Sequence, residues 1–309
     1  MAVMNGHQLS DPEVAAFAED GFVVCPSLAP PEVCAKLKLI AEMHLSELIA
    51  PVEYEVDVLY PGAPSDAIAP GGQTSRRLLQ AYARDAAFRE WATSEALAGV
   101  LEQLFASSAV VMLSQCHHNC VMTKTPGFSS VTLWHQDVRY WSFDQENLIS
   151  VWLALGPEDK TNGCLRVIPG SNQRIEPFHL VSYAERQVAR VSHVDESNAV
   201  DMVLRQGQVG IFDCNTIHGS SSNNSRNRRF ALVNDYTPAA AQQSVGTGSG
   251  QLVRGLNSRK LWGEEPKPQG SFSENNIIGR REILNSYPEN VLMGPLSEEQ
   301  QPSFADQHQ

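Results

Sequence analysis

The stretch VTLWHQD, residues 131–137, joins a β-type apolar run to a histidine and an aspartate, two residue types that can bind metals. Side chains alternate along an extended strand, so His135 and Asp137 are expected to point to the same face. Two such side chains can share one metal ion, and a third ligand must then come from another part of the chain. A His-x-Asp triplet is a weak signal on its own because it also arises by chance at strand ends. Whether this triplet binds a metal must therefore be judged from the sequence around it.

Short runs of β-forming residues surround this stretch. Turn-forming residues separate the runs, as in TNG at 161–163 and PGS at 169–171. Many short strands at this spacing predict a mainly β protein with an antiparallel sandwich or barrel, such as a jelly roll. The runs cover residues 110–113, 131–134, 148–155, 165–168, 209–212 and 230–233.

The first third of the chain is predicted to be mainly helical. SDPE at residues 10–13 has the pattern of a capping box, and a short strand is expected at 22–24. A second helix is expected to begin near Pro31, and two more are expected at 81–91 and 94–106. The second helix has one apolar face at helical spacing, formed by Val33, Leu37, Ile40, Ala41, Leu45 and Leu48.

No stretch of linker composition divides the chain, so we predict a single domain over residues 1–309. Within it we expect a mainly helical flank at 1–108, a jelly-roll core at 109–237 and a C-terminal extension at 238–309.

His218 is the best candidate for the third metal ligand. It follows the β-type run at 208–214 and begins the sequence His-Gly-Ser. Two histidines and one carboxylate form the facial triad that is typical of non-haem iron(II) oxygenases. Three protein ligands occupy one face of an octahedron. The other three positions then suffice for a bidentate 2-oxo acid and for dioxygen.

Arg229 follows His218 by eleven residues, on a second β-type run. A 2-oxo diacid that binds iron through its keto-acid end leaves its distal carboxylate in the pocket. A buried carboxylate needs a charge partner, and arginine offers two parallel hydrogen bonds to it. Ser220 is placed to add a hydroxyl to the same carboxylate. Arg226, Arg228 and Arg229 would otherwise be interpreted as a solvated turn.

Bulk composition limits the classes of function. The chain has 309 residues and a net charge of −12, which disfavours nucleic acid as a partner. No apolar run reaches the roughly 20 residues that span a bilayer, and the N-terminus lacks a secretory signal pattern. The six cysteines show no disulfide-framework spacing and are expected to be free and mostly buried. We therefore expect a cytoplasmic enzyme, a monomer or homodimer, that acts on a small molecule and not at a membrane.

Three segments resemble one known family: HQDVRYW at 135–141, NGCLRVIPGS at 162–171 and FDCNTIHGS at 212–220. They are similar to the phytanoyl-CoA dioxygenase (PhyH) family of iron(II)- and 2-oxoglutarate-dependent oxygenases, which includes ectoine hydroxylase. The resemblance runs from about residue 11 to about residue 237. It implies a double-stranded β-helix, which is a jelly-roll variant, with helices packed on one side.

The resemblance also implies a role for each residue of the site. The iron(II) ligands would be His135, Asp137 and His218. The residues that contact 2-oxoglutarate would be Arg229, Ser220, Trp152 and Lys124. The implied reaction consumes dioxygen and 2-oxoglutarate, releases succinate and carbon dioxide, and hydroxylates an unactivated C–H bond. Related halogenases carry a small residue in place of the carboxylate, so Asp137 favours hydroxylation.

Two features restrict the substrate that the resemblance suggests. The sequence after Asp137 shares Trp141 with ectoine hydroxylases but lacks the acidic stretch that follows there, which argues against ectoine. The acidic net charge offers no support for binding a CoA phosphate. Tyr140, Trp141 and Phe143 are interpreted as an aromatic wall of the substrate pocket or as core.

Other classes of function remain open at the level of sequence. The same fold hosts cupin-type metal enzymes and binding proteins that use no 2-oxo acid, and Arg229 with Ser220 argues against them. A degenerate, non-catalytic member of the family is disfavoured by the intact triad. The CHHNC sequence at 116–120 looks like a metal cluster but lacks a second pair of ligands, which favours a core strand. His118 or Asn119 is an alternative residue of the substrate pocket.

Overall fold

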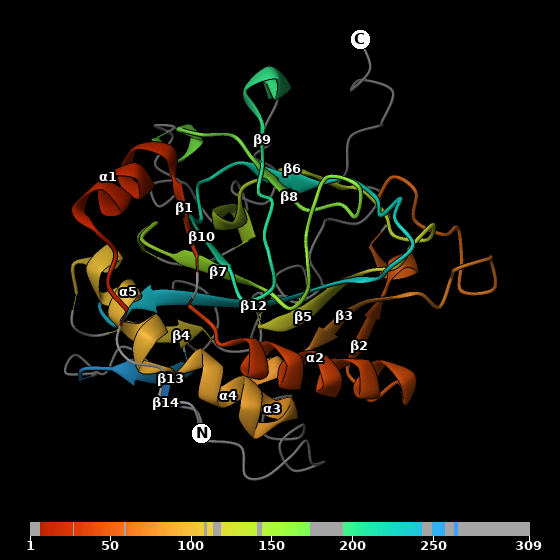
Figure 1. Ribbon diagram of the computed structural model, residues 1–309, viewed down its shortest axis with the longest axis horizontal. Coiled ribbons are helices and arrows are strands. Elements are labelled where there is room, and N and C mark those ends of the chain that lie inside the picture. Colours follow the sequence, from red (N-terminus) through yellow and green to blue (C-terminus); the bar gives the residue numbers. More distant parts are fainter. Residues whose placement is uncertain are drawn as a thin grey trace.

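The structure is a computed structural model that describes most of the first 256 residues. The described residues are 7–26, 28–58, 60–107, 110–113, 119–140, 144–173, 194–242, 249–256 and 263–264. Two β-sheets lie one over the other, and helices cover the outer side of the larger sheet (Figure 1). The expectation of a mainly β protein with flanking helices is confirmed.

The large sheet has ten strands. Its main path is β1 (Phe22–Cys25), β10 (Val209–Asp213), β7 (Ile149–Ala154), β12 (Arg229–Pro238), β4 (Val110–Leu113), β13 (Ser249–Arg254) and β14 (Gly263–Glu264). A branch leaves β12 through β5 (Cys120–Lys124), β3 (Ser75–Leu79) and β2 (Val52–Tyr54). The small sheet has the order β6 (Thr132–His135), β11 (His218–Ser220), β8 (Leu165–Val167) and β9 (Val200–Asp201).

The helices lie in the first third of the chain, as predicted. They are α1 (Asp11–Asp20), α2 (Pro31–Ser46), α3 (Ala81–Arg84), α4 (Ala86–Ala92) and α5 (Glu95–Phe105). Ser10 and Glu13 form the predicted capping box of α1. The helix expected at 81–91 is broken at Asp85, which has extended backbone and whose side chain caps α4 by accepting from the Ala87 N–H.

The predicted apolar face of α2 is right through Leu45 and wrong at Leu48. Leu37, Ala41 and Leu45 are buried in the core. Leu48 lies beyond the end of the helix, with a φ of 50°, and is 49% exposed. The apolar spacing in the sequence extends to Leu48, but the helix ends at Ser46, so the spacing predicted too long a helix.

Strands outside the predicted core at 109–237 join the large sheet on both sides. From the N-terminal side, β1 pairs with β10 and β3 pairs with β5. From the C-terminal side, β13 pairs with β4. The assignment of one domain to residues 1–309 stays a prediction.

The strand β12 separates two apolar cores. Phe230, Leu232 and Tyr236 face the core under the helices. Ala231 and Val233 face the core between the two sheets, which β8 also lines. Because side chains alternate along a strand, Arg229 lies on the same side of β12 as Ala231 and Val233. The interior between the sheets is thus the side that holds the functional residues.

None of the helices in the described part of the chain is long and apolar enough to cross a membrane. The five cysteines described with their side chains are free and buried, as expected: Cys25, Cys34, Cys120, Cys164 and Cys214.

Replacing Leu232 by alanine should test the core under the helices. Leu232 is fully buried at the middle of β12, so Leu232→Ala is expected to lower the free energy of unfolding by about 2–5 kcal/mol. The matched control is Leu39→Ala on α2, where the leucine is 67% exposed and the change should stay within about 0.5 kcal/mol. Urea denaturation followed by circular dichroism measures both. Equal effects of the two changes would contradict this account of the core.

Candidate metal and co-substrate site

The three predicted ligands come from two neighbouring strands of the small sheet. His135 is the last residue of β6 and His218 is the first residue of β11, and the two are direct partners in the antiparallel pairing. Asp137 lies beyond β6, at the start of the 3-10 helix η2 (Asp137–Tyr140). The two residues of the triplet therefore do not share a strand face. The chain leaves the strand between them, and the first turn of η2 presents the carboxylate to the rings.

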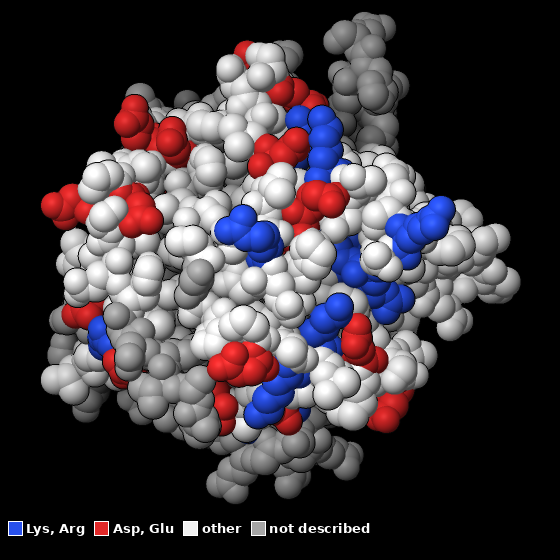
Figure 2. Space-filling view, viewed as in Figure 1, with Lys and Arg blue, Asp and Glu red and all other residues white. Residues whose placement is uncertain are grey.

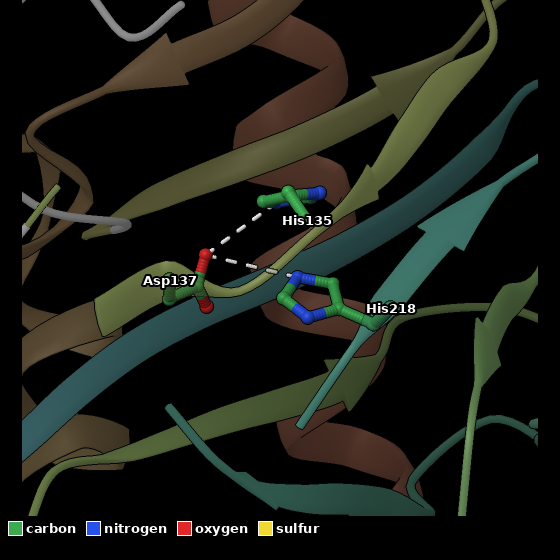
Figure 3. Close-up of side chains that lie close together, drawn as sticks. All are labelled: His135, Asp137 and His218. Atoms are coloured by element: carbon green, nitrogen blue, oxygen red, sulfur yellow. Dashed lines mark ion pairs between the residues drawn. The ribbon is translucent and has the colours of Figure 1, made fainter. Parts of the chain in front are cut away.

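The ligand-type atoms of the three side chains converge on one point (Figure 3). The Oδ1 atom of Asp137 lies 3.5 Å from Nε2 of His135 and 3.7 Å from Nε2 of His218. The ring centroids of the two histidines are 4.2 Å apart, and the rings are tilted by 52°. All three residues are buried.

Each imidazole is fixed in one tautomer by the backbone. Nδ1 of His135 lies 2.8 Å from the carbonyl oxygen of Leu133, and Nδ1 of His218 lies 2.9 Å from that of Thr216. A carbonyl oxygen only accepts hydrogen bonds, so both Nδ1 atoms carry the proton and donate it. Both Nε2 atoms then present a lone pair to the point where the three side chains meet. Metal-binding histidines are held in this way in other proteins.

The carboxylate of Asp137 is oriented from its other oxygen. Ser150, on β7 of the large sheet, donates a 3.2 Å hydrogen bond from Oγ to Oδ2 of Asp137. Both residues are fully buried. Oδ1 is thereby turned toward the two imidazoles. This contact connects the ligand set on the small sheet to the large sheet.

The loop before His218 is tied to the segment that carries the other two ligands. Nε2 of Gln136 donates to the carbonyl oxygen of Asn215 at 2.5 Å, and the N–H of Val138 donates to that of Cys214 at 3.1 Å. Oγ1 of Thr216 donates to the carbonyl oxygen of Gly21 at 2.8 Å. The first two bonds join the two ligand-bearing segments, and the third joins the loop before His218 to Gly21, which follows α1.

The donor set fits a divalent transition metal. Ligand atoms in adjacent positions around a metal with bonds of about 2.1 Å are about 3 Å apart. The distances from Oδ1 of Asp137 to the two Nε2 atoms therefore need only a small contraction. Two neutral imidazoles and one carboxylate are the donors that iron(II) oxygenases use. Within the described ranges, these three residues are the only group of histidine, cysteine and acidic side chains close enough to hold an ion.

A second part of the site is a set of buried charges near Arg229. Charged side chains lie on the face of the molecule seen in Figure 2, as expected for groups that water stabilises. Arg229 is an exception, because it is 2% exposed at the start of β12 and faces the interior between the sheets. Its guanidinium lies 5.0 Å from the centre of the Trp152 ring and donates from Nη1 to the carbonyl oxygen of Gly163. Nε makes no hydrogen bond to any described residue, so Arg229 retains a donor for a ligand.

Lys124 and Ser220, the other predicted contacts, lie on strands that border this interior. Lys124 is the direct partner of Arg229 in the pairing of β5 with β12, and its Nζ donates to the carbonyl oxygen of Ser130 at 2.7 Å. Burial, and then the charges of Arg229 and Arg76, hold the pKa of Lys124 well below its usual value. Ser220 is buried on β11, two residues after His218.

Sequence reasoning missed two charged residues of this interior. Glu158 is 1% exposed, and its Oε2 lies 3.9 Å from Nε of Arg229. Arg76 is buried, and its terminal nitrogens donate to Oγ of Ser130 at 3.1 Å and to Oγ1 of Thr132 at 3.2 Å. Both residues stand next to other charged residues, because Arg77 follows Arg76 and Asp159 follows Glu158. The sequence does not show which member of such a group is buried.

The comparisons with known proteins give one family. The family model described as phytanoyl-CoA dioxygenase (PhyH) matches residues 17–231. The chain belongs to this family. It is 24% identical over 240 residues to an ectoine dioxygenase of Sphingopyxis alaskensis, covering 71% of this chain and 72% of that protein. It is 32% identical over 131 residues to the peroxisomal phytanoyl-CoA dioxygenase of Bos taurus, covering 40% of this chain and 39% of that protein.

Solved structures share the fold at low sequence identity. The non-haem monooxygenase ThoJ, in its apo form, matches 90% of this chain and 96% of its own chain with a TM-score of 0.68 and 18% identity. EctD from S. alaskensis, solved with 2-oxoglutarate and 5-hydroxyectoine, matches 79% and 83% of the two chains with a TM-score of 0.58 and 20% identity. The predicted double-stranded β-helix is confirmed.

The family match also confirms the predicted class of enzyme, a dioxygenase that uses iron(II) and 2-oxoglutarate. The roles of individual residues stay predictions. Several other candidates lie outside the described residues: Cys116, His117, His118, Trp141 and Phe143, as well as the side chain of Tyr140. Asn119 is described and is buried, with its Oδ1 accepting from the N–H of Tyr82 at 3.1 Å.

Removing one imidazole should abolish tight metal binding. His218→Ala leaves two of the three donors. We expect its affinity for iron(II) to fall by more than about 100-fold, because losing a residue that only hydrogen-bonds to a ligand already costs about 10- to 100-fold. Anaerobic calorimetry with iron(II) measures this, with His7→Ala as the control. Unchanged iron binding in His218→Ala would rule out the triad.

Ser150→Ala should weaken the site without removing a ligand. Loss of the hydrogen bond to Oδ2 frees the Asp137 carboxylate to rotate, so we expect iron(II) affinity to fall by about 10- to 100-fold. The same calorimetric titration measures it. A Ser150→Thr variant retains the hydroxyl and should recover part of the loss. Equal loss in both variants would point to packing and not to the hydrogen bond.

Proposed function

We propose that this chain is an iron(II)- and 2-oxoglutarate-dependent dioxygenase that hydroxylates an unactivated C–H bond of a small molecule, with iron held by His135, Asp137 and His218. The observation that carries the proposal is the convergence of two Nε2 atoms and one carboxylate oxygen, with both imidazole tautomers fixed by backbone carbonyls. When bound, iron(II) supplies the activation of dioxygen, which is coupled to the conversion of 2-oxoglutarate into succinate and carbon dioxide.

The protein ligands would leave one side of the metal open. Three donors from β6, η2 and β11 occupy one face of an octahedron, and the opposite face is then available to the 2-oxo acid and dioxygen. The hydrogen bonds at Nδ1 and from Ser150 keep these donors in place before the metal binds. Little reorganisation is then needed when the metal and the co-substrate enter.

The distal carboxylate of 2-oxoglutarate would bind Arg229. Its guanidinium is buried against Trp152 and holds a donor that no described residue uses. A charge-assisted bond to a carboxylate is strong in such a water-poor interior. The Ser220 hydroxyl and the Lys124 side chain would complete this end of the pocket, which would position the co-substrate with its keto-acid end toward the metal.

The substrate belongs to the class of small molecules. The names of the relatives include ectoine dioxygenase, phytanoyl-CoA dioxygenase and a probable hypophosphite dioxygenase, and these activities belong to those proteins. The peroxisomal relative is matched over only about two fifths of its length. We place the enzyme in the cytoplasm because its described cysteines are free and buried, as in a reducing compartment. We also propose that it is a monomer or homodimer.

The proposal is tested by the visible absorption spectrum of the protein under anaerobic conditions. A weak charge-transfer band is expected only when iron(II) and 2-oxoglutarate are both present. Iron binding without this band would favour a cupin-type enzyme that uses no 2-oxo acid. The absence of iron binding would rule out the proposed centre.

Replacing the arginine should weaken co-substrate binding selectively. Arg229→Ala removes the charge partner of the distal carboxylate, so the 2-oxoglutarate needed for half-maximal band intensity should rise by at least about 10-fold while iron binding is retained. The matched control is Arg205→Ala, which alters an exposed arginine between β9 and β10. This variant should bind 2-oxoglutarate with the same affinity as the unmodified (parent) protein. Equal affinity in Arg229→Ala and the parent would contradict the assignment.

A further inference from the structure

Glu158 is a buried carboxylate at the place where the co-substrate carboxylate is proposed to bind. It follows β7 and is 1% exposed. Nε1 of Trp152 lies 3.0 Å from its Oε1 and 3.2 Å from its Oε2, and Nε of Arg229 lies 3.9 Å from Oε2. The side chain thus contacts both the arginine and the tryptophan of the proposed co-substrate site.

Arg229 is the charged group that acts on this carboxylate directly. Arg76 and Glu55 influence the charge of Arg229, and the same two residues also influence that of Lys124. The Cys164 thiol faces Glu158, and burial raises its pKa to about 12, which keeps it neutral at ordinary pH. The region therefore combines two buried arginines and a buried lysine with the buried carboxyl groups of Glu55 and Glu158.

In the absence of co-substrate, Glu158 provides a counter-charge for Arg229. A buried guanidinium without an anion is strongly unfavourable, so the pair is expected in the ligand-free protein. A second carboxylate that binds Arg229 would approach Glu158 in an interior of low polarity. Two carboxylates that share one guanidinium repel each other, and this repulsion favours the protonated form of one of them.

Given the proposed function of this site, on which the inference rests, we infer that Glu158 takes up a proton from solvent when the dicarboxylate co-substrate binds Arg229, so that co-substrate affinity falls as the pH rises. The proton goes to a carboxylate oxygen of Glu158, and the co-substrate replaces Glu158 as the anionic partner of the arginine. Trp152 continues to donate to the other oxygen, so the side chain stays in place. Glu158 acts as a positioning residue and sets the pH range of tight binding.

The pKa of Glu158 in the ligand-free protein is consistent with proton uptake on binding. Burial raises the pKa of Glu158 above its ordinary value, and the charge of Arg229 and the bond from Trp152 oppose that shift. An added carboxylate at Arg229 raises it further. Below the pKa of the ligand-free protein, Glu158 is already protonated and binding takes up no proton. Between that pKa and the higher pKa of Glu158 in the complex, binding takes up a proton, and the dissociation constant rises by up to about tenfold for each pH unit.

The test is anaerobic calorimetry of 2-oxoglutarate binding to the iron(II)-loaded protein between about pH 6 and about pH 8.5, where the ligand carboxylates are fully ionised. Titrations in two buffers with different ionisation enthalpies give the number of protons taken up. The parent protein should take up as much as about one proton, and its dissociation constant should rise with pH. No proton uptake across this range, with binding intact, overturns the inference. No binding at all overturns the proposed function as well.

The variant Glu158→Gln separates this residue from other titrating groups. Glutamine has the same shape and still accepts from Trp152, but it carries no charge. Proton uptake should disappear, and binding at the upper end of the pH range should be at least about tenfold tighter than in the parent. The matched control, Glu196→Gln, alters an exposed glutamate in the 3-10 helix η5 (Glu196–Asn198) and should behave as the parent.

Lys124 is the other buried group whose titration would weaken anion binding at high pH. Lys124→Met is therefore measured in parallel. Under the inference it binds more weakly than the parent but still takes up the proton. A pH dependence that survives in Glu158→Gln and disappears in Lys124→Met would assign the effect to the lysine and overturn the inference.

Discussion

The antiparallel pairing of β6 with β11 is the constraint on which the site depends. It sets His218 directly opposite His135, although the two residues are far apart in sequence. Residues that face each other in such a pair have side chains within a few ångströms, so the pairing alone brings two imidazoles together. The turn into η2 then adds Asp137. A shift of one residue in this pairing would send one imidazole to the opposite face of the sheet.

The second constraint is electrostatic. The interior between the sheets holds four charged residues that are each almost completely buried: Arg229, Lys124, Arg76 and Glu158. Buried charges are tolerated only when each has a partner, so this region is organised by its ion pairs and hydrogen bonds. The same organisation prepares it for a ligand with a carboxylate. Co-substrate binding is then an exchange of anionic partners around one guanidinium.

The two parts of the site share one scaffold. The large sheet supplies Ser150, which orients the carboxylate of Asp137, and Trp152, which packs on Arg229 and bonds to Glu158. Both residues lie on the same face of β7, two positions apart, because side chains alternate along the strand. One strand therefore supports the metal ligands and the co-substrate arginine together. A change in the packing of β7 is expected to affect both.

The sequence by itself determined the fold class, the family and the residue types of the triad and of Arg229, because strand periodicity, turn residues and short motifs are local properties. It did not determine that Asp137 stands on a turn, because alternation describes only an unbroken strand. It missed Glu158, Arg76 and Ser150, since the burial of a single polar side chain depends on elements far away in the sequence. It also limited the sheet to residues 109–237, whereas β1 and β13 join it through long-range pairing. Only the tertiary structure decided which charges face one another, because that depends on strand register and on the exclusion of water between the sheets.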